Sequence, residues 1–191
     1  MPEKRLTQVV HEALAAVVQP GETCIDATAG NGRDTVVLAQ LVGALGRVHA
    51  FDVLAEAIER TRQALAASGC ARQTTLWQRG HETLQATLPT VAQASVAAIT
   101  FNLGFLPGGD KIRCTRAPET LAAIAQAWTL LRPAGLLSLL CYTGHPGGRD
   151  ETDAVLDWAH SLPPTDAHLR FQKPEGPVVH PPELLLVTRL T

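Results

Sequence analysis

The 191-residue chain has few aromatic residues, widely spaced cysteines and almost no net charge. Lys and Arg total 16 against 18 Asp and Glu, so the formal net charge of −2 excludes a generally basic, nucleic-acid-coating surface. The four cysteines form no C-x-x-C pair, which argues against a zinc ribbon or a disulfide scaffold. We therefore expect free thiols in a reducing compartment and no metal site.

Long apolar runs are also absent. The longest, residues 134–142, is much shorter than the about 20 residues that a bilayer-spanning helix needs. The N-terminal apolar stretch is interrupted by Gln8, His11 and Glu12, so no targeting segment is predicted. Hydrophobic residues nevertheless make up 46% of the chain, enough for a buried core. We expect one domain over residues 1–191, cytoplasmic and without membrane contact.

Short β-branched runs alternate along the chain with Ala- and Leu-rich helical stretches. The hydrophobic spacing predicts helices over residues 5–18, 33–42, 55–67, 82–88, 118–131 and 151–162. It predicts strands over residues 23–27, 46–53, 74–78, 96–101, 136–142, 168–172 and 184–190. This alternation is typical of an α/β fold, a mainly parallel seven-stranded sheet with helices on both faces. The last two strands have no helix between them and should pair antiparallel at one edge.

The first strand–helix turn carries the clearest binding signal. Gly30 and Gly32 allow the backbone to turn tightly and to approach a ligand closely. Asp52 ends the second predicted strand, 20 residues after Gly32, a distance typical of an acid that binds ribose hydroxyls. The turn lacks the third glycine of a dinucleotide fingerprint and the GK[ST] of a phosphate loop. A nucleoside site without a phosphate cradle is therefore predicted.

Asp26 and Asp34 flank these glycines. Two carboxylates would repel a pyrophosphate but suit a ligand that carries an ammonium and a sulfonium, and S-adenosylmethionine is such a ligand. The simpler alternative is a tight turn whose acids only cap the next helix, as Asn31 can also do.

A second group of polar residues follows the fourth predicted strand. Asn102 begins a glycine-containing loop, residues 102–115, that can aim carbonyls and an amide at a reacting group. Lys111, Arg113 and Arg116 make this loop locally basic, so it can hold RNA phosphates. An ordinary solvated polar loop is the alternative.

The fifth predicted strand ends in a glycine-rich turn with the chain's one tyrosine. Tyr142 can stack on a base, and His145 can accept a proton near neutral pH, although a histidine in such a turn is more often structural. His81 follows the third strand, where an adenine edge is often contacted. Three other histidines, His11, His160 and His168, are interpreted as surface or helix residues.

These motifs resemble class I S-adenosylmethionine-dependent methyltransferases with a Rossmann-like domain. The set Asp-Ala-Thr-x-Gly-Asn-Gly-x-Asp-Thr, Gly-His-Glu, Asn-Leu-Gly-Phe-Leu-Pro-x-Gly-Asp-Lys and Tyr-x-Gly-His is similar to one narrower family, the bacterial MnmM (YtqB-type) enzymes. The resemblance implies methylation of the aminomethyl group of 5-aminomethyl-(2-thio)uridine at the tRNA wobble position. It also implies contact with the tRNA anticodon loop and a tendency to form homodimers.

The residue patterns and the resemblance together assign roles to individual positions. Residues expected to hold S-adenosylmethionine are Asp26, Gly30, Asn31, Gly32, Asp34, Thr35, Asp52, His81 and Glu82. Residues expected to be catalytic are Asn102, Asp110 and His145, and those expected to bind the nucleotide are Lys111, Arg113 and Tyr142.

Two positions depart from the family pattern. Leu54 stands where relatives often carry a polar side chain, and residues 178–182 (Val-Val-His-Pro-Pro) replace an Asn-containing segment. If that Asn holds the anticodon loop, the substrate can differ. An rRNA or small-amine methyltransferase and a non-catalytic nucleoside-binding protein therefore stay open as alternatives.

Overall fold

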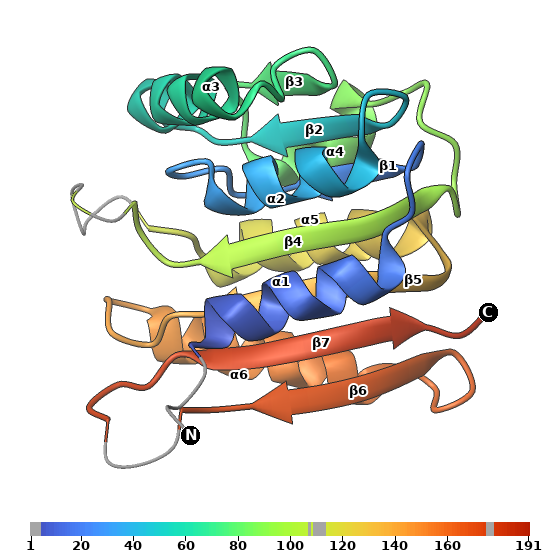
Figure 1. Cartoon of the computed structure of the whole chain (residues 1–191). Coiled ribbons are helices and arrows are strands. Elements are labelled where there is room, and N and C mark those ends of the chain that lie inside the picture. Colours follow the sequence, from blue (N-terminus) through green and yellow to red (C-terminus); the bar gives the residue numbers. More distant parts are fainter. Residues whose placement is uncertain (1–4, 107, 109–113, 175–177) are drawn as a thin grey trace.

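The computed structural model describes residues 5–106, 108, 114–174 and 178–191. Within these residues one seven-stranded sheet runs in the order β3-β2-β1-β4-β5-β7-β6 (Figure 1). The strands are β1 (Thr23–Asp26), β2 (Arg47–Phe51), β3 (Thr74–Trp77), β4 (Val96–Leu103), β5 (Leu131–Cys141), β6 (Ala167–Gln172) and β7 (Glu183–Arg189).

Strands β1 to β5 are parallel, because a helical segment returns the chain to the same edge after each of them. Their carboxyl ends lie together at the left of Figure 1. Strand β7 is antiparallel to both β5 and β6. The predicted mainly parallel sheet with an antiparallel edge pair is confirmed.

Helices cover both faces of the sheet (Figure 1). The elements are α1 (Leu6–Val17), α2 (Arg33–Val42), α3 (Ala55–Ser68), a 3-10 turn η1 (His81–Thr83), α4 (Leu84–Thr87), α5 (Ala117–Leu130) and α6 (Gly148–Ser161). Helices α1, α2 and α3 supply one apolar core, and α4, α5 and α6 supply the other. Seven of the eight residues of β4 are buried, because this central strand is covered on both sides.

The strand bounds differ from the predicted ones by a few residues, and the differences in β4 and β5 are the informative ones. Asn102 was expected in a loop but lies inside β4, where it pairs with Leu140 of β5. Strand β5 starts at Leu131 instead of residue 136, and its register against β4 shifts between Leu131 and Leu136. Pro133 within the irregular segment has no N–H to donate, which hid the first part of the strand from a sequence reading.

Among the described residues, no helix combines the length and apolar character that crossing a membrane requires. Cys24, Cys70 and Cys141 are buried free thiols, in agreement with the prediction.

Candidate functional site

The glycine turn after β1 packs directly against the end of β2. The Gly30 N–H donates to Asp52 Oδ2 at 3.0 Å, and the Ala29 N–H donates to the Phe51 carbonyl at 2.8 Å. Gly30 and Gly32 have φ values of +53° and +79°, in the left-handed region that favours glycine. A Cβ on Gly32 would lie 2.9 Å from Thr61 Cα of α3, so this glycine also permits the close approach of α3. The predicted neighbourhood of turn and acid is confirmed.

Asp52 is half-buried, and its carboxylate lies against the Gly30 backbone of this turn. Its second oxygen, Oδ1, accepts the Leu54 N–H at 2.9 Å. Burial raises the pKa of Asp52, while the two backbone N–H donors act in the opposite direction. The backbone of Leu54 thus supports Asp52, although its side chain departs from the family pattern.

Asp26 is more buried than Asp34 and supports the glycine turn through hydrogen bonds. It is fully buried, and its oxygens accept the Thr35 hydroxyl at 2.6 Å and the Thr28 N–H at 3.2 Å. Burial, and then the charge of Asp34, raises the pKa of Asp26. The geometry therefore favours a supporting role for Asp26 and Thr35 rather than contact with a ligand.

Asp34, in the first turn of α2, joins two side chains from different parts of the chain. Its Oδ1 lies 2.6 Å from His11 Nε2 on α1, and its Oδ2 accepts the Asn102 Nδ2 amide at 2.7 Å. The hydrogen bond to Asp34 raises the pKa of His11. His11 is a helix residue, as predicted, but its contact with Asp34 was not predicted, because nothing local in the sequence shows where α1 docks.

Asn102 is held at both its backbone and its side chain. Its N–H donates to the Thr28 hydroxyl at 2.6 Å, and its amide nitrogen donates to Asp34. Because a carboxylate only accepts hydrogen bonds, this pairing fixes which way the amide faces. The side-chain carbonyl oxygen of Asn102, Oδ1, accepts no hydrogen bond from any described residue and stays available to a ligand.

His81 and Glu82 lie beyond β3, on the same edge of the sheet. His81 is buried with its ring edge-on to Phe101, and burial lowers its pKa, which favours the neutral ring. Glu82 is exposed, and its carboxylate lies beside Gly80. Asn31 in the glycine turn accepts a hydrogen bond from Arg60 at 3.0 Å.

Tyr142 and His145 follow β5. The Tyr142 N–H donates to the Leu103 carbonyl at 2.8 Å, and a Cβ on Gly104 would lie 3.1 Å from Tyr142 Cβ. Tyr142 is 39% exposed beside the end of β4. It is therefore open to a ligand next to Asn102.

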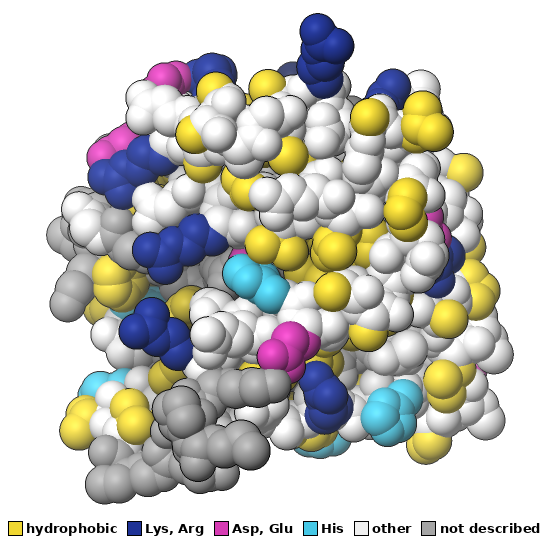
Figure 2. Space-filling model, in the orientation of Figure 1, with side chains coloured by type: hydrophobic (Ala, Val, Ile, Leu, Met, Phe, Trp, Pro, Cys, Tyr) yellow, Lys and Arg dark blue, Asp and Glu magenta, His cyan; other side chains and the backbone are white. Residues whose placement is uncertain are grey.

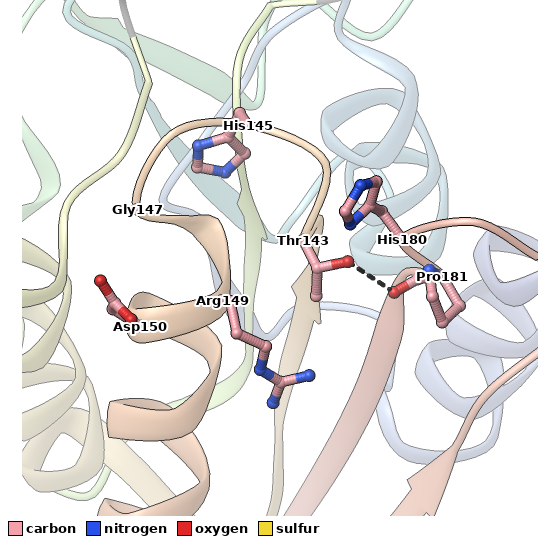
Figure 3. Close-up of a pocket in the computed structure, with 7 residues that line it drawn as sticks. All are labelled: Thr143, His145, Gly147, Arg149, Asp150, His180 and Pro181. Atoms are coloured by element: carbon pink, nitrogen blue, oxygen red, sulfur yellow. Dashed lines mark hydrogen bonds between the residues drawn. The ribbon is translucent and has the colours of Figure 1, made fainter.

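His145 lines a pocket of about 520 Å³ together with Thr143, Arg149 and His180 (Figure 3). Its Nδ1 lies 3.1 Å from the Pro146 carbonyl, which can only accept, so Nδ1 carries the proton in the neutral ring. Nε2 is buried and has no hydrogen-bond partner among the described residues. Pro181, in the segment that departs from the family pattern, accepts the Thr143 hydroxyl at 3.0 Å.

Three predicted site residues, Asp110, Lys111 and Arg113, lie outside the described residues. Arg116 is the residue before α5. In the part of the chain that the structure describes, no cluster of three or more His, Cys, Asp and Glu side chains is suited to a metal ion.

Comparison with known proteins gives consistent matches. A family model described as "Putative rRNA methylase" matches residues 48–188. The chain is 38% identical over 171 residues to the "tRNA (mnm(5)s(2)U34)-methyltransferase, chloroplastic" of Arabidopsis thaliana, which covers 85% of this chain. The chain spans 62% of the length of that relative.

Two solved structures match along almost their whole length. A "putative rRNA-methylase" from Clostridium thermocellum superposes with a TM-score of 0.92 at 30% identity, covering 100% of both chains. A "putative methyltransferase" from Streptococcus mutans, solved in complex with S-adenosylhomocysteine, has a TM-score of 0.86 at 32% identity, covering 98% of this chain and 99% of that one.

Proposed function

The chain belongs to the family described as "Putative rRNA methylase", and from that premise we propose that it methylates the aminomethyl group of 5-aminomethyl-(2-thio)uridine at the tRNA wobble position. The chain is an S-adenosylmethionine-dependent methyltransferase. The choice of tRNA is supported by the 38% identity to the Arabidopsis enzyme that carries this activity in its name.

The residues at the first turn fit S-adenosylmethionine. Asp52 presents a half-buried carboxylate whose two oxygens are oriented by backbone N–H groups, an arrangement suited to the two ribose hydroxyls. A Cβ on Gly30 would lie 3.8 Å from Leu106 Cδ1 and from the Thr28 carbonyl oxygen, an ordinary van der Waals distance, so no atom crowds the backbone there. Asp34 adds an acid that suits the ammonium or the sulfonium. The cofactor, when bound, supplies an electrophilic methyl group to a neutral amine in an in-line displacement.

Asn102 is the observation that carries the proposed reaction. Its amide nitrogen is committed to Asp34 at 2.7 Å, so its carbonyl oxygen is the end that can accept an N–H of the substrate amine. That bond would orient the amine lone pair, and positioning of this kind can lower a barrier by about 7–11 kcal/mol in favourable cases. Asp34 thereby acts on the amine through Asn102.

The substrate amine must be neutral to attack the methyl group, so its ammonium form must first lose a proton. We assign the proton-accepting role to Asp110 and His145, whose Nε2 is an acceptor nitrogen without a partner among the described residues but is buried, so proton transfer to it needs a path that substrate binding opens. Tyr142, exposed beside Gly104, is assigned to the nucleotide.

The experiment supplies the protein with methyl-labelled S-adenosylmethionine and tRNA that lacks the final methyl group. Digestion to nucleosides and mass spectrometry should place the label in 5-methylaminomethyl-(2-thio)uridine. Label found only in rRNA, which the family description favours, or only in a small amine would show that the substrate is not the tRNA wobble uridine. Absence of any cofactor binding would favour the non-catalytic nucleoside-binding alternative.

The homodimer stays a prediction. Light scattering on the purified protein, with and without tRNA, tests it directly.

A further inference from the structure

A second pocket, of about 410 Å³, lies beside the proposed reaction site. Its walls include Arg5 before α1, Arg33 at the start of α2, Leu140 of β5 and Tyr142. Tyr142 is shared with the reaction site, because it packs over Gly104 and its N–H bonds to Leu103. Arg33, which lines the pocket, directly precedes Asp34, the residue that binds the Asn102 amide.

The two arginines of this pocket have no carboxylate partner among the described residues, unlike four other arginines of the chain. Arg60, Arg62, Arg132 and Arg149 each form an ion pair with a neighbouring acid. Arg5 and Arg33 are exposed and form no ion pair with any described residue. Lys and Arg side chains are visible along the edge where the parallel strands end, at the left of Figure 2. In a chain of net charge −2, two uncompensated guanidinium groups on one concavity indicate an anionic ligand.

We propose that Arg5 and Arg33 bind an RNA backbone phosphate next to the target nucleotide, with a base against Tyr142. The proposal rests on the proposed function and adds the RNA contact that the first turn cannot provide. Asp34 and Asp52 would repel a polyanion, so cations adjacent to them are needed to bring RNA to the site. Guanidinium groups form charge-assisted hydrogen bonds with phosphate, and tyrosine stacks on single-stranded bases.

The test compares Arg5→Gln, Arg33→Gln and the double variant with wild-type protein. Arg72→Gln is the matched control, because Arg72 is exposed and lies just before β3, an edge strand that three other strands separate from β5. The measurements are the dissociation constants of an anticodon stem-loop at several salt concentrations and of S-adenosylmethionine. Each pocket variant should weaken stem-loop binding about tenfold and reduce the slope of log K against log salt by about 0.7. The affinity for the cofactor should change less than about twofold.

Equal stem-loop affinity and equal salt slope in the double variant and in Arg72→Gln would overturn the proposal. Loss of binding to a uridine mononucleotide with unchanged stem-loop binding would also overturn it, because the pocket would then take a free nucleotide. A wild-type protein that binds the stem-loop through these arginines, yet transfers no methyl group to it, would refute the proposed function and leave the phosphate site standing.

Discussion

Replacing Asp34 by Asn tests whether this carboxylate sets the direction of the Asn102 amide. The two oxygens of Asp34 now face His11 Nε2 at 2.6 Å and Asn102 Nδ2 at 2.7 Å. An amide at position 34 has one acceptor oxygen, so its nitrogen must face one of these two groups. If it faces Asn102, the Asn102 amide turns over and presents its nitrogen, instead of its oxygen, to the substrate amine.

The size of the effect follows from the bond that is lost. A hydrogen bond to a charged group contributes about 1.5–3 kcal/mol, so kcat should fall about 10- to 100-fold. The assay is methyl transfer to the stem-loop at saturating cofactor and RNA. The affinity for S-adenosylmethionine and the melting temperature are measured in parallel, because a merely structural defect would lower both.

Asn102→Ala and the Asp34→Asn/Asn102→Ala double variant complete the experiment. If Asp34 acts through Asn102, the second substitution should add little to the first. An unchanged kcat for Asp34→Asn would refute the argument. A loss of cofactor affinity with kcat unchanged would mean that Asp34 serves the cofactor alone and does not orient the amide.

Three further predictions concern the fold around the site. The pKa of His11 is raised above 6.5, so its contribution to stability is present below about pH 6.5 and declines as the pH rises through the higher folded-state pKa. His11→Gln should therefore lower the free energy of unfolding by about 0.5–1 kcal/mol at pH 6 and by less at pH 9, measured by urea denaturation. Gly32→Ala should lower the free energy of unfolding by about 2 kcal/mol or more, because the alanine would have a strained positive φ and its Cβ would collide with Thr61. A melting temperature within about 2 °C of wild type would contradict this. Burial raises the pKa of the thiols of Cys24 and Cys141 to about 12, so iodoacetamide at pH 8 should modify the partly exposed Cys114 first, as read by peptide mass spectrometry.

The sequence predicted the layers of this fold because hydrophobic spacing records which face of each element is buried. Helix α2 was predicted with its observed bounds, residues 33–42, and the turn containing Gly30 and Gly32 was predicted beside Asp52. Local signals suffice in both cases, because a glycine turn and a strand-terminal acid meet whenever two neighbouring strands are parallel.

Contacts between residues that lie far apart in the chain could not be predicted from hydrophobic spacing or local motifs. His11 lies 23 residues before Asp34 in the chain, and only the docking of α1 on the sheet brings them together. Asn102 was assigned to a loop because polar residues are rare in buried strands, but its amide is paired with Asp34 and its backbone with Thr28. Asp26 was interpreted as facing a ligand because depth below the surface cannot be read from spacing alone.

The most direct test of the account is a crystal structure of the protein with S-adenosylhomocysteine and an anticodon stem-loop carrying 5-aminomethyluridine. The ribose hydroxyls should lie within hydrogen-bonding distance of Asp52, and the aminomethyl nitrogen should donate to the side-chain carbonyl oxygen of Asn102. A ribose bound away from Asp52, or a target uridine seated where Asn102 cannot reach its amine, would contradict it.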